Sequence, residues 1–233
     1  MYHLLSKYSY LNQEQTQEFY TTQVTNIIKI AADRNGYFDY YGTRKLNKPM
    51  DELLNTAKIE SNKPNKQTAI FICLATIILI SKILNEVDDS NEYVFGFIKE
   101  AFKILETIAG SENLEYRNEL FTISIRKLSA DKSNNFDLYK HLITLAATAI
   151  TTKEQVAQLK PYLLSTDNSK YDNEFFAKTK LDLIENFEGK NKANKFLLNN
   201  LQHSLFRETA INNTIEANNY INAKKYAQEG KVI

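Results

Sequence analysis

The chain has 233 residues, enough for one large domain or two small ones with a buried core. Its 43% hydrophobic and 24% charged residues are typical of a soluble globular protein, and a net charge of +1 excludes a strong field that attracts nucleic acid or an anionic membrane. Lys makes up 24 of the 29 basic residues, which argues against a dedicated nucleic-acid reader because bidentate readout favours Arg. Only 6 Gly and 3 Pro occur, too few for the many turns of an all-β fold.

The first helix is expected over Gln13–Arg34, where apolar residues recur at spacings of three to five. Asn35-Gly36 ends it, because Gly36 can adopt the left-handed conformation of a helix cap. We expect Tyr37–Lys48 to be a loop or a short extended segment. Pro49 then suits the first turn of the next helix, where its missing N–H would have no partner in any case.

A turn over Ser61–Asn65 precedes a helix over Lys66–Glu86. This segment is rich in Ile, so a strand is the competing interpretation, but strands usually run only about four to eight residues. The run Ala69–Ile80 should be the most buried segment and be covered on all sides. It is shorter than the roughly 20 apolar residues that cross a bilayer as a helix, so no membrane contact is expected.

The next helix is expected from Asp88-Asp89-Ser90 to Ala109, with Gly110 ending it. Later helical segments recur about every 15 residues, so two of them form a unit on the scale of helix-hairpin repeats. The expected segments are Leu114–Ser129, Asn135–Ile150, Lys153–Leu164, Asp172–Glu188, Lys190–Ser204, Arg207–Ala217 and Tyr220–Glu229.

The fold class predicted from this pattern is all-α, with antiparallel helix hairpins stacked into an irregular solenoid. The segment Tyr220–Gly230 looks like the second helix of a tetratricopeptide-like hairpin, with Ala223 toward the packed neighbour. We expect an N-terminal helical bundle over 1–130, which contains the Asp-Asp-Ser segment. A part with hairpin repeats over 131–233 should pack continuously with it.

Two short motifs carry a resemblance to a known family. Gly36-Tyr37-Phe38-Asp39-Tyr40 precedes two helices, and Asp88-Asp89-Ser90 follows about 50 residues later. This order resembles the α-helical region that follows the zinc finger in bacterial SWIM-type zinc finger proteins, and Arg207-Glu208 and Ala223–Gly230 look like that family's helical repeats. The family commonly has Asp-Gly after the Ser, whereas this chain has Asn91-Glu92.

The zinc finger of that family is not carried over to this chain. The SWIM site needs three Cys and one His, and this chain has a single cysteine, so neither zinc nor any other metal or cofactor is carried over. Related bacterial proteins are similar to members of systems that contain an AAA ATPase and a von Willebrand A-type protein. The resemblance therefore implies protein partners of these kinds.

Four residues are candidates for binding a partner. Asp88 and Asp89 could hold a cation or a basic partner, or they could cap the following helix. Asp39 and Tyr40 could form part of a polar pocket, or Asp39 could bond to nearby backbone while the aromatic residues around it close the core.

Other reactive residue types show no pattern of a site. His3, His141 and His203 lack ligand spacing. Cys73 lies in the apolar run and is expected to be an inert core thiol. A single cysteine also suits a reducing cytoplasm. The N-terminal residues lack the apolar core of a signal peptide. Gly189-Lys190 lacks the rest of a phosphate-binding loop, so no catalytic residue is assigned.

The sequence therefore favours a non-catalytic, cytoplasmic scaffold for protein–protein interaction. One alternative is a nucleic-acid-associated accessory module, suggested by the family's zinc finger and by Lys190, Lys192 and Lys195. The other is an unrecognised hydrolase, whose active site only the fold would assemble. Folding is expected to need no metal; Asp88, Asp89, Glu92 and then His141 are the first residues to test otherwise.

Overall fold

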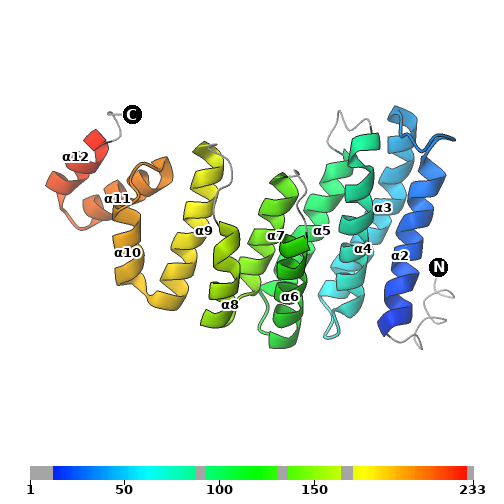
Figure 1. Ribbon diagram of the computed structural model, residues 1–233, viewed down its shortest axis with the longest axis horizontal. Helices are drawn as coiled ribbons and strands as arrows, with labels where there is room; N and C mark the ends of the chain where they lie inside the picture. The colour runs from blue at the N-terminus through cyan, green and yellow to red at the C-terminus, as the bar shows by residue number, and fades with distance from the viewer. Residues whose placement is uncertain (1–12, 88–92, 131–135, 164–169, 230–233) are drawn as a thin grey trace. The chain divides into compact units, whose positions relative to one another are not determined.

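A computed structural model describes residues 13–87, 93–130, 136–163 and 170–229, and these residues are all-helical (Figure 1). This part of the chain contains eleven α-helices and no strand, so the prediction of an all-α fold is confirmed. The bounds are α2 Gln13–Ala31, α3 Tyr40–Ser61, α4 Gln67–Ile83, α5 Tyr93–Ala109, α6 Leu114–Ala130, α7 Phe136–Ala149, α8 Lys153–Leu159, α9 Lys170–Glu188, α10 Lys190–Leu198, α11 Ser204–Glu216 and α12 Tyr220–Glu229, with the 3-10 helices η1 Leu84–Glu86 and η2 Lys160–Leu163.

The described residues form two compact units. Unit 1 comprises residues 13–87, 93–124 and 136–149, that is, helices α2 to α5, the first part of α6, and α7. Unit 2 comprises residues 125–130, 150–163 and 170–229. Each expected helix is present, and most of its ends are displaced by only a few residues. The exceptions are the start of α3, the end of α10, which lies at Leu198 instead of Ser204, and the start of α5, where Asp88-Asp89-Ser90 lies outside the described residues.

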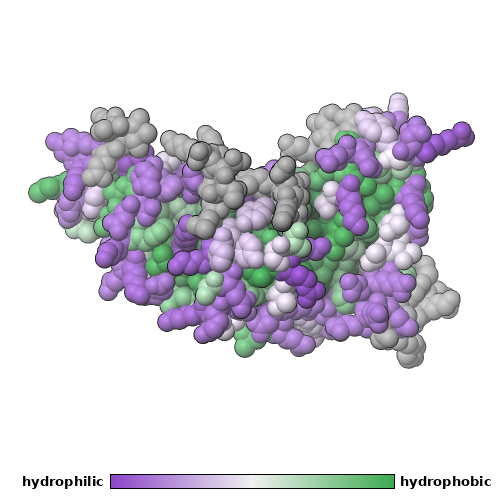
Figure 2. All heavy atoms as spheres, viewed as in Figure 1, coloured by the Kyte–Doolittle hydropathy of each residue, from purple (hydrophilic) through white to green (hydrophobic). Residues whose placement is uncertain are grey.

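Helix α4 is the centre of unit 1, where it packs against α2, α3 and α5. The run Ala69–Ile80 lies within it and is largely buried, as the sequence predicts. The expectation of complete cover is wrong, because Leu74, Ile78 and Leu79 are only partly buried. Figure 2 shows apolar residues on the visible face where α4 lies. Neighbouring helices thus bury most of α4 and leave an apolar stripe at the surface.

Helix α4 and η1 together span Gln67–Glu86, whose 20 residues are long and apolar enough to cross a membrane by length and composition. The sequence expectation counted only Ala69–Ile80 and is therefore wrong on length. Half of the most apolar window is buried inside the protein (50%). The core helix of a soluble protein meets the same criteria, so this feature is weak evidence for a membrane span.

Helix α3 begins earlier than the sequence predicts. The expected loop over Tyr37–Lys48 is helical from Tyr40, and Pro49 lies inside the helix instead of in its first turn. Asp39 provides the start signal, because its Oδ1 accepts a hydrogen bond of 2.7 Å from the backbone N–H of Gly42. This bond satisfies one of the free N–H groups at the helix start.

Pro49 is tolerated because its neighbours are well packed. A proline in a helix interior removes one hydrogen bond and costs about 3 kcal/mol. Leu46 and Met50 lie on the same helix and are 0% exposed. Burying apolar side chains of this size contributes about 1.5–3 kcal/mol each. Tertiary packing therefore offsets the local preference for a helix end.

The connection between α2 and α3 is tightly packed. Gly36 has a φ of 83°, the left-handed conformation predicted for it, but it lies in a turn with Asp33 and does not end α2, whose last residue is Ala31. The buried Phe38 donates its N–H to the carbonyl of Glu86 at 3.0 Å. A Cβ atom at Gly42 would lie 2.7 Å from the carbonyl oxygen of Ala31, so a side chain there would collide with the end of α2.

Helix α6 adds to the local capping of α4, in which Asn65 Oδ1 accepts a hydrogen bond from the backbone N–H of Gln67 at 3.0 Å. The N-cap residue Lys66 makes no side-chain cap, but its N–H donates to the Tyr116 hydroxyl at 3.0 Å. Tyr116 in turn donates to Asn65 Oδ1 at 3.3 Å, and Gln67 Nε2 donates to Glu119 Oε1 at 2.9 Å. The start of the central helix is thus held from a neighbouring helix.

In unit 2, successive helices pack in pairs along the chain: α9 contacts α10, α10 contacts α11, and α11 contacts α12. A small apolar core joins α9, α10 and α11. Its buried members are Ala177, Leu197, Phe206 and Ala210. Partly buried side chains pack against this cluster from α9 to α12: Leu181, Phe196, Leu198, Leu201 and Tyr226.

Candidate functional site

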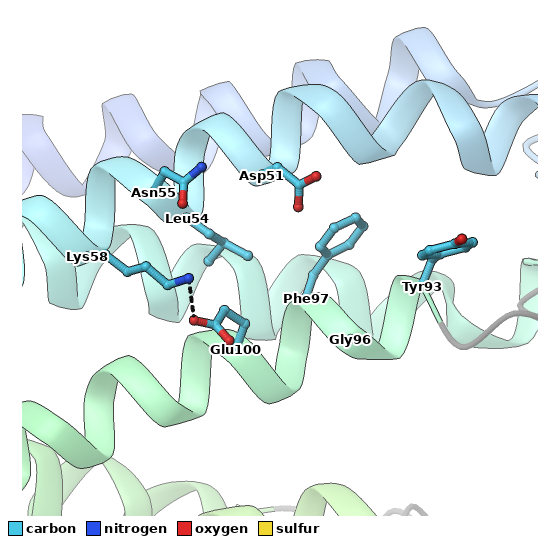
Figure 3. A pocket seen from close by; sticks show the side chains of 8 residues that line it. All are labelled: Asp51, Leu54, Asn55, Lys58, Tyr93, Gly96, Phe97 and Glu100. Atoms are coloured by element: carbon cyan, nitrogen blue, oxygen red, sulfur yellow. Dashed lines mark ion pairs between the residues drawn. The ribbon is translucent and has the colours of Figure 1, made fainter.

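Unit 1 contains an open groove of about 310 Å³ between α3 and α5 (Figure 3). This volume is at the lower end of the range for small-molecule sites in proteins. The residues that line the groove are Asp51, Leu54, Asn55 and Lys58 from α3 and Tyr93, Gly96, Phe97 and Glu100 from α5.

Helical periodicity places these residues on facing sides of the two helices. Asp51 and Lys58 are seven residues apart, which is about two turns, and Leu54 lies between them. The same interval separates Tyr93 from Glu100 on α5. Leu54 is 3% exposed and belongs to the core, so the packing of the two helices fixes the groove in place.

The groove has an apolar floor and a polar rim. Leu54 and Phe97 are buried and form the floor together with the bare backbone of Gly96. Tyr93 is 52% exposed and Asp51 is also exposed, so both remain accessible to a molecule in the groove. This combination is typical of a surface where apolar contacts provide affinity and polar contacts provide orientation.

The charged groups differ between the two ends of the groove. At one end, Lys58 Nζ lies 2.8 Å from Glu100 Oε1, an ion pair that links α3 to α5 across the groove. Exposed pairs of this kind contribute at most about 1 kcal/mol. At the other end, Figure 3 shows the Asp51 carboxylate near the ring of Phe97, with Tyr93 farther along α5. Asp51 makes no ion pair with another described residue, so its negative charge is not neutralised within the part of the groove that the structure describes.

Gly96 keeps the groove open. A Cβ atom built on Gly96 would meet nothing within 4 Å, although the residue lies inside α5. Glycine in a helix interior is less stable than Ala by about 0.5–1 kcal/mol. An Ala at position 96 would therefore fit and make α5 more stable, but the chain has Gly there.

Two of the four predicted partner-binding residues can be placed. The carboxylate of Asp39 caps α3, which agrees with the interpretation that it bonds to nearby backbone. Tyr40 is 52% exposed, contacts the Tyr41 ring edge to face at 5.7 Å and has the Arg44 guanidinium 5.7 Å from its ring centre. Neither residue lines the groove. Asp88 and Asp89 lie outside the described residues.

The other reactive residue types are dispersed, as their spacing in the sequence suggests. Cys73 is 0% exposed, and burial raises the pKa of its thiol. His141 stacks on Phe102 with ring centres 5.0 Å apart, and His203 packs against Phe206. Among the residues described here, no group of three or more His, Cys, Asp or Glu side chains could hold a metal ion.

The expected lysine cluster on α10 is partly neutralised. Lys192 forms an exposed ion pair with Glu188 at 3.0 Å, and Lys190 and Lys195 are exposed. This arrangement agrees with the interpretation of the cluster as a solvated helix face.

Sequence reasoning missed the groove because its residues come from two segments about 40 residues apart. One signal was available, since Gly96 interrupts an otherwise apolar helical pattern over Tyr93–Ala109. Asp51 and Glu100 resemble ordinary exposed helix residues until the fold brings their helices together.

Comparisons of the chain with protein-family models, with curated proteins and with solved structures found no match.

Proposed function

We propose that this protein is a non-catalytic helical scaffold that binds another protein through the groove between α3 and α5. The observation that supports this function is the groove itself, with its buried apolar floor, its exposed polar rim and the open backbone at Gly96. A helical segment of a partner protein commonly binds in a groove of this kind.

The chemistry of the lining favours binding over catalysis. Among the described residues that line the groove there is no Ser, Thr, Cys or His, the residues that supply most nucleophiles and many general bases in enzymes. Its two carboxylates, Asp51 and Glu100, lie at opposite ends, and the latter is held by Lys58. Open water access also weakens electrostatic stabilisation of a transition state.

The wider proposal concerns architecture and cellular role. We propose that the helix hairpins stack as an irregular solenoid, tetratricopeptide-like toward the C-terminus, which the packing of sequential helices from α9 to α12 supports. We also propose a cytoplasmic protein related to the helical region of SWIM-type zinc finger proteins. An AAA ATPase or a von Willebrand A-type protein is then the partner class to examine first.

The proposed function can be tested by affinity capture from the native cell followed by mass spectrometry. The wild-type chain is compared with Gly96→Leu, which fills the groove, and with Thr107→Leu, an exposed site on α5 outside the groove. We expect a partner that wild type and Thr107→Leu recover and that Gly96→Leu loses. The same set of proteins on all three baits would contradict a role for the groove, provided that circular dichroism shows equal helicity.

A further inference from the structure

The groove has an electrostatic asymmetry that restricts what can bind there. Three charged side chains of the described residues line it: the carboxylates of Asp51 and Glu100 and the ammonium of Lys58. Since Lys58 neutralises Glu100 at one end, the net charge of −1 is concentrated at Asp51. An anionic ligand at that end would be repelled, and a cationic one would be attracted.

Two aromatic rings line the same end of the groove as this carboxylate. Figure 3 shows Tyr93 and Phe97 at the same end of the groove as Asp51, and Tyr93 is 52% exposed. A Lys or Arg side chain is attracted both by a carboxylate and by the face of an aromatic ring within about 6 Å. An exposed carboxylate and an exposed Tyr at the same end of one groove therefore fit the long, amphipathic side chain of a basic residue.

We propose that the groove binds a basic and apolar peptide segment of a partner protein, with a Lys or Arg side chain between Asp51 and Tyr93. An apolar residue of the same segment lies over Gly96, against the floor formed by Leu54 and Phe97. The inference rests on the proposed function and adds the chemistry of the partner. A metal ion is a poorer occupant of this end, because one carboxylate supplies too few ligands for a strong site.

The open space at Gly96 supports a peptide occupant. A helix gains stability when an interior Gly is replaced by Ala, and no neighbouring atom prevents that change here. Absence of a side chain at position 96 lets another backbone or an apolar side chain approach α5 closely. Gly96 thus makes α5 less stable and in return permits a close contact with the partner.

The inference can be tested with a displayed library of random 12-residue peptides, selected separately on four forms of the full chain. The forms are wild type, Asp51→Lys, the adjacent control Glu52→Lys and the groove-filling Gly96→Leu. Glu52 is exposed on the same helix but does not line the groove, so its substitution makes the same charge change outside the site. Circular dichroism confirms the fold of each form.

We expect wild type and Glu52→Lys to enrich peptides that combine a Lys or Arg with apolar residues. Asp51→Lys should bind the best of these peptides at least about tenfold more weakly, and the loss should shrink with added salt. Enriched peptides without a basic residue, unaffected by Asp51→Lys but lost in Gly96→Leu, would overturn the partner chemistry while the proposed function stands. Peptide binding that Gly96→Leu leaves unchanged would overturn both.

Tyr93 provides an independent measurement with the best enriched peptide. Tyr93→Phe keeps the ring face and should change the Kd by less than about twofold, whereas Tyr93→Ala should weaken binding by about fivefold or more. Equal affinity of Tyr93→Ala and wild type would show that the basic side chain does not lie on this ring and would overturn that contact.

Discussion

A Cβ atom at Gly42 would lie 2.7 Å from the carbonyl oxygen of Ala31, closer than such atoms approach in proteins. The contact joins the first turn of α3 to the last residue of α2, and both residues are buried. We therefore expect Gly42→Ala to lower the free energy of unfolding by about 1–3 kcal/mol, because one helix must shift. Thermal or urea unfolding measures this change.

Gly96→Ala is the matched control, since Gly96 also lies in a helix but has no neighbour within 4 Å of the added methyl group. We expect this variant to raise the free energy of unfolding by about 0.5–1 kcal/mol through helix propensity alone. A loss of stability at Gly96, or none at Gly42, would contradict the packing described for these helices.

Replacement of Ile77 by Asp tests whether α4 is a core helix. Ile77 is 8% exposed in the most buried segment of unit 1. An unpaired carboxylate there should destabilise the protein by several kcal/mol, so we expect loss of cooperative unfolding at ambient temperature. Wild-type melting of this variant in aqueous buffer would show that this face of α4 is accessible to water.

The Arg117 side chain on α6 forms hydrogen bonds with the end of α7. Its Nη2 donates to the carbonyl of Thr148 at 3.1 Å and its Nε donates to that of Ala149 at 3.3 Å. We expect Arg117→Met to lower the free energy of unfolding by about 1–2 kcal/mol, because it removes charged donors from helix-terminal carbonyls. Arg117→Lys should lose less in the same denaturation experiment, since an ammonium can still serve one carbonyl. Equal stability of all three forms would contradict a capping role.

His141 should make stability dependent on pH. Burial lowers its pKa in the folded chain, Lys99 lowers it further, and Asp137 partly opposes this shift. In the unfolded chain the pKa returns to about 6.5, so between the two values the unfolded chain binds more protons. The free energy of unfolding should therefore fall as the pH decreases from about 7 through the folded pKa.

The variant His141→Phe keeps a ring against Phe102 and removes the titration. Denaturation at about pH 7.5 and about pH 5.5 should show a smaller loss of stability for this variant than for wild type. Identical losses would assign the acid sensitivity to other groups.

Chelation is expected to leave the fold unchanged. The single cysteine and the dispersed histidines cannot build a four-ligand zinc site. Prolonged treatment with a chelator should therefore leave helicity and melting temperature unchanged, as measured by circular dichroism. A fall of several degrees that zinc or calcium restores would reveal a site, with Asp88, Asp89 and Glu92 as the first residues to substitute.

Local signals in the sequence determined much of the helical structure. The length of the Ile-rich segment identified α4 as a helix, and Gly36 adopts the left-handed conformation that the sequence indicates, although α2 already ends at Ala31. These features depend on periodicity and on backbone conformation, which neighbouring residues impose on one another. The same local reasoning was wrong at Pro49, where buried neighbours outweigh the lost hydrogen bond.

Only the tertiary structure decided where the candidate site lies. Asp51 and Tyr93 are ordinary surface residues in the sequence, and the packing of α3 with α5 brings them to one groove. Likewise, nothing near Lys66 in the sequence indicates that Tyr116 caps its helix. Contacts between distant segments depend on how complete helices pack, a property that short sequence windows do not contain.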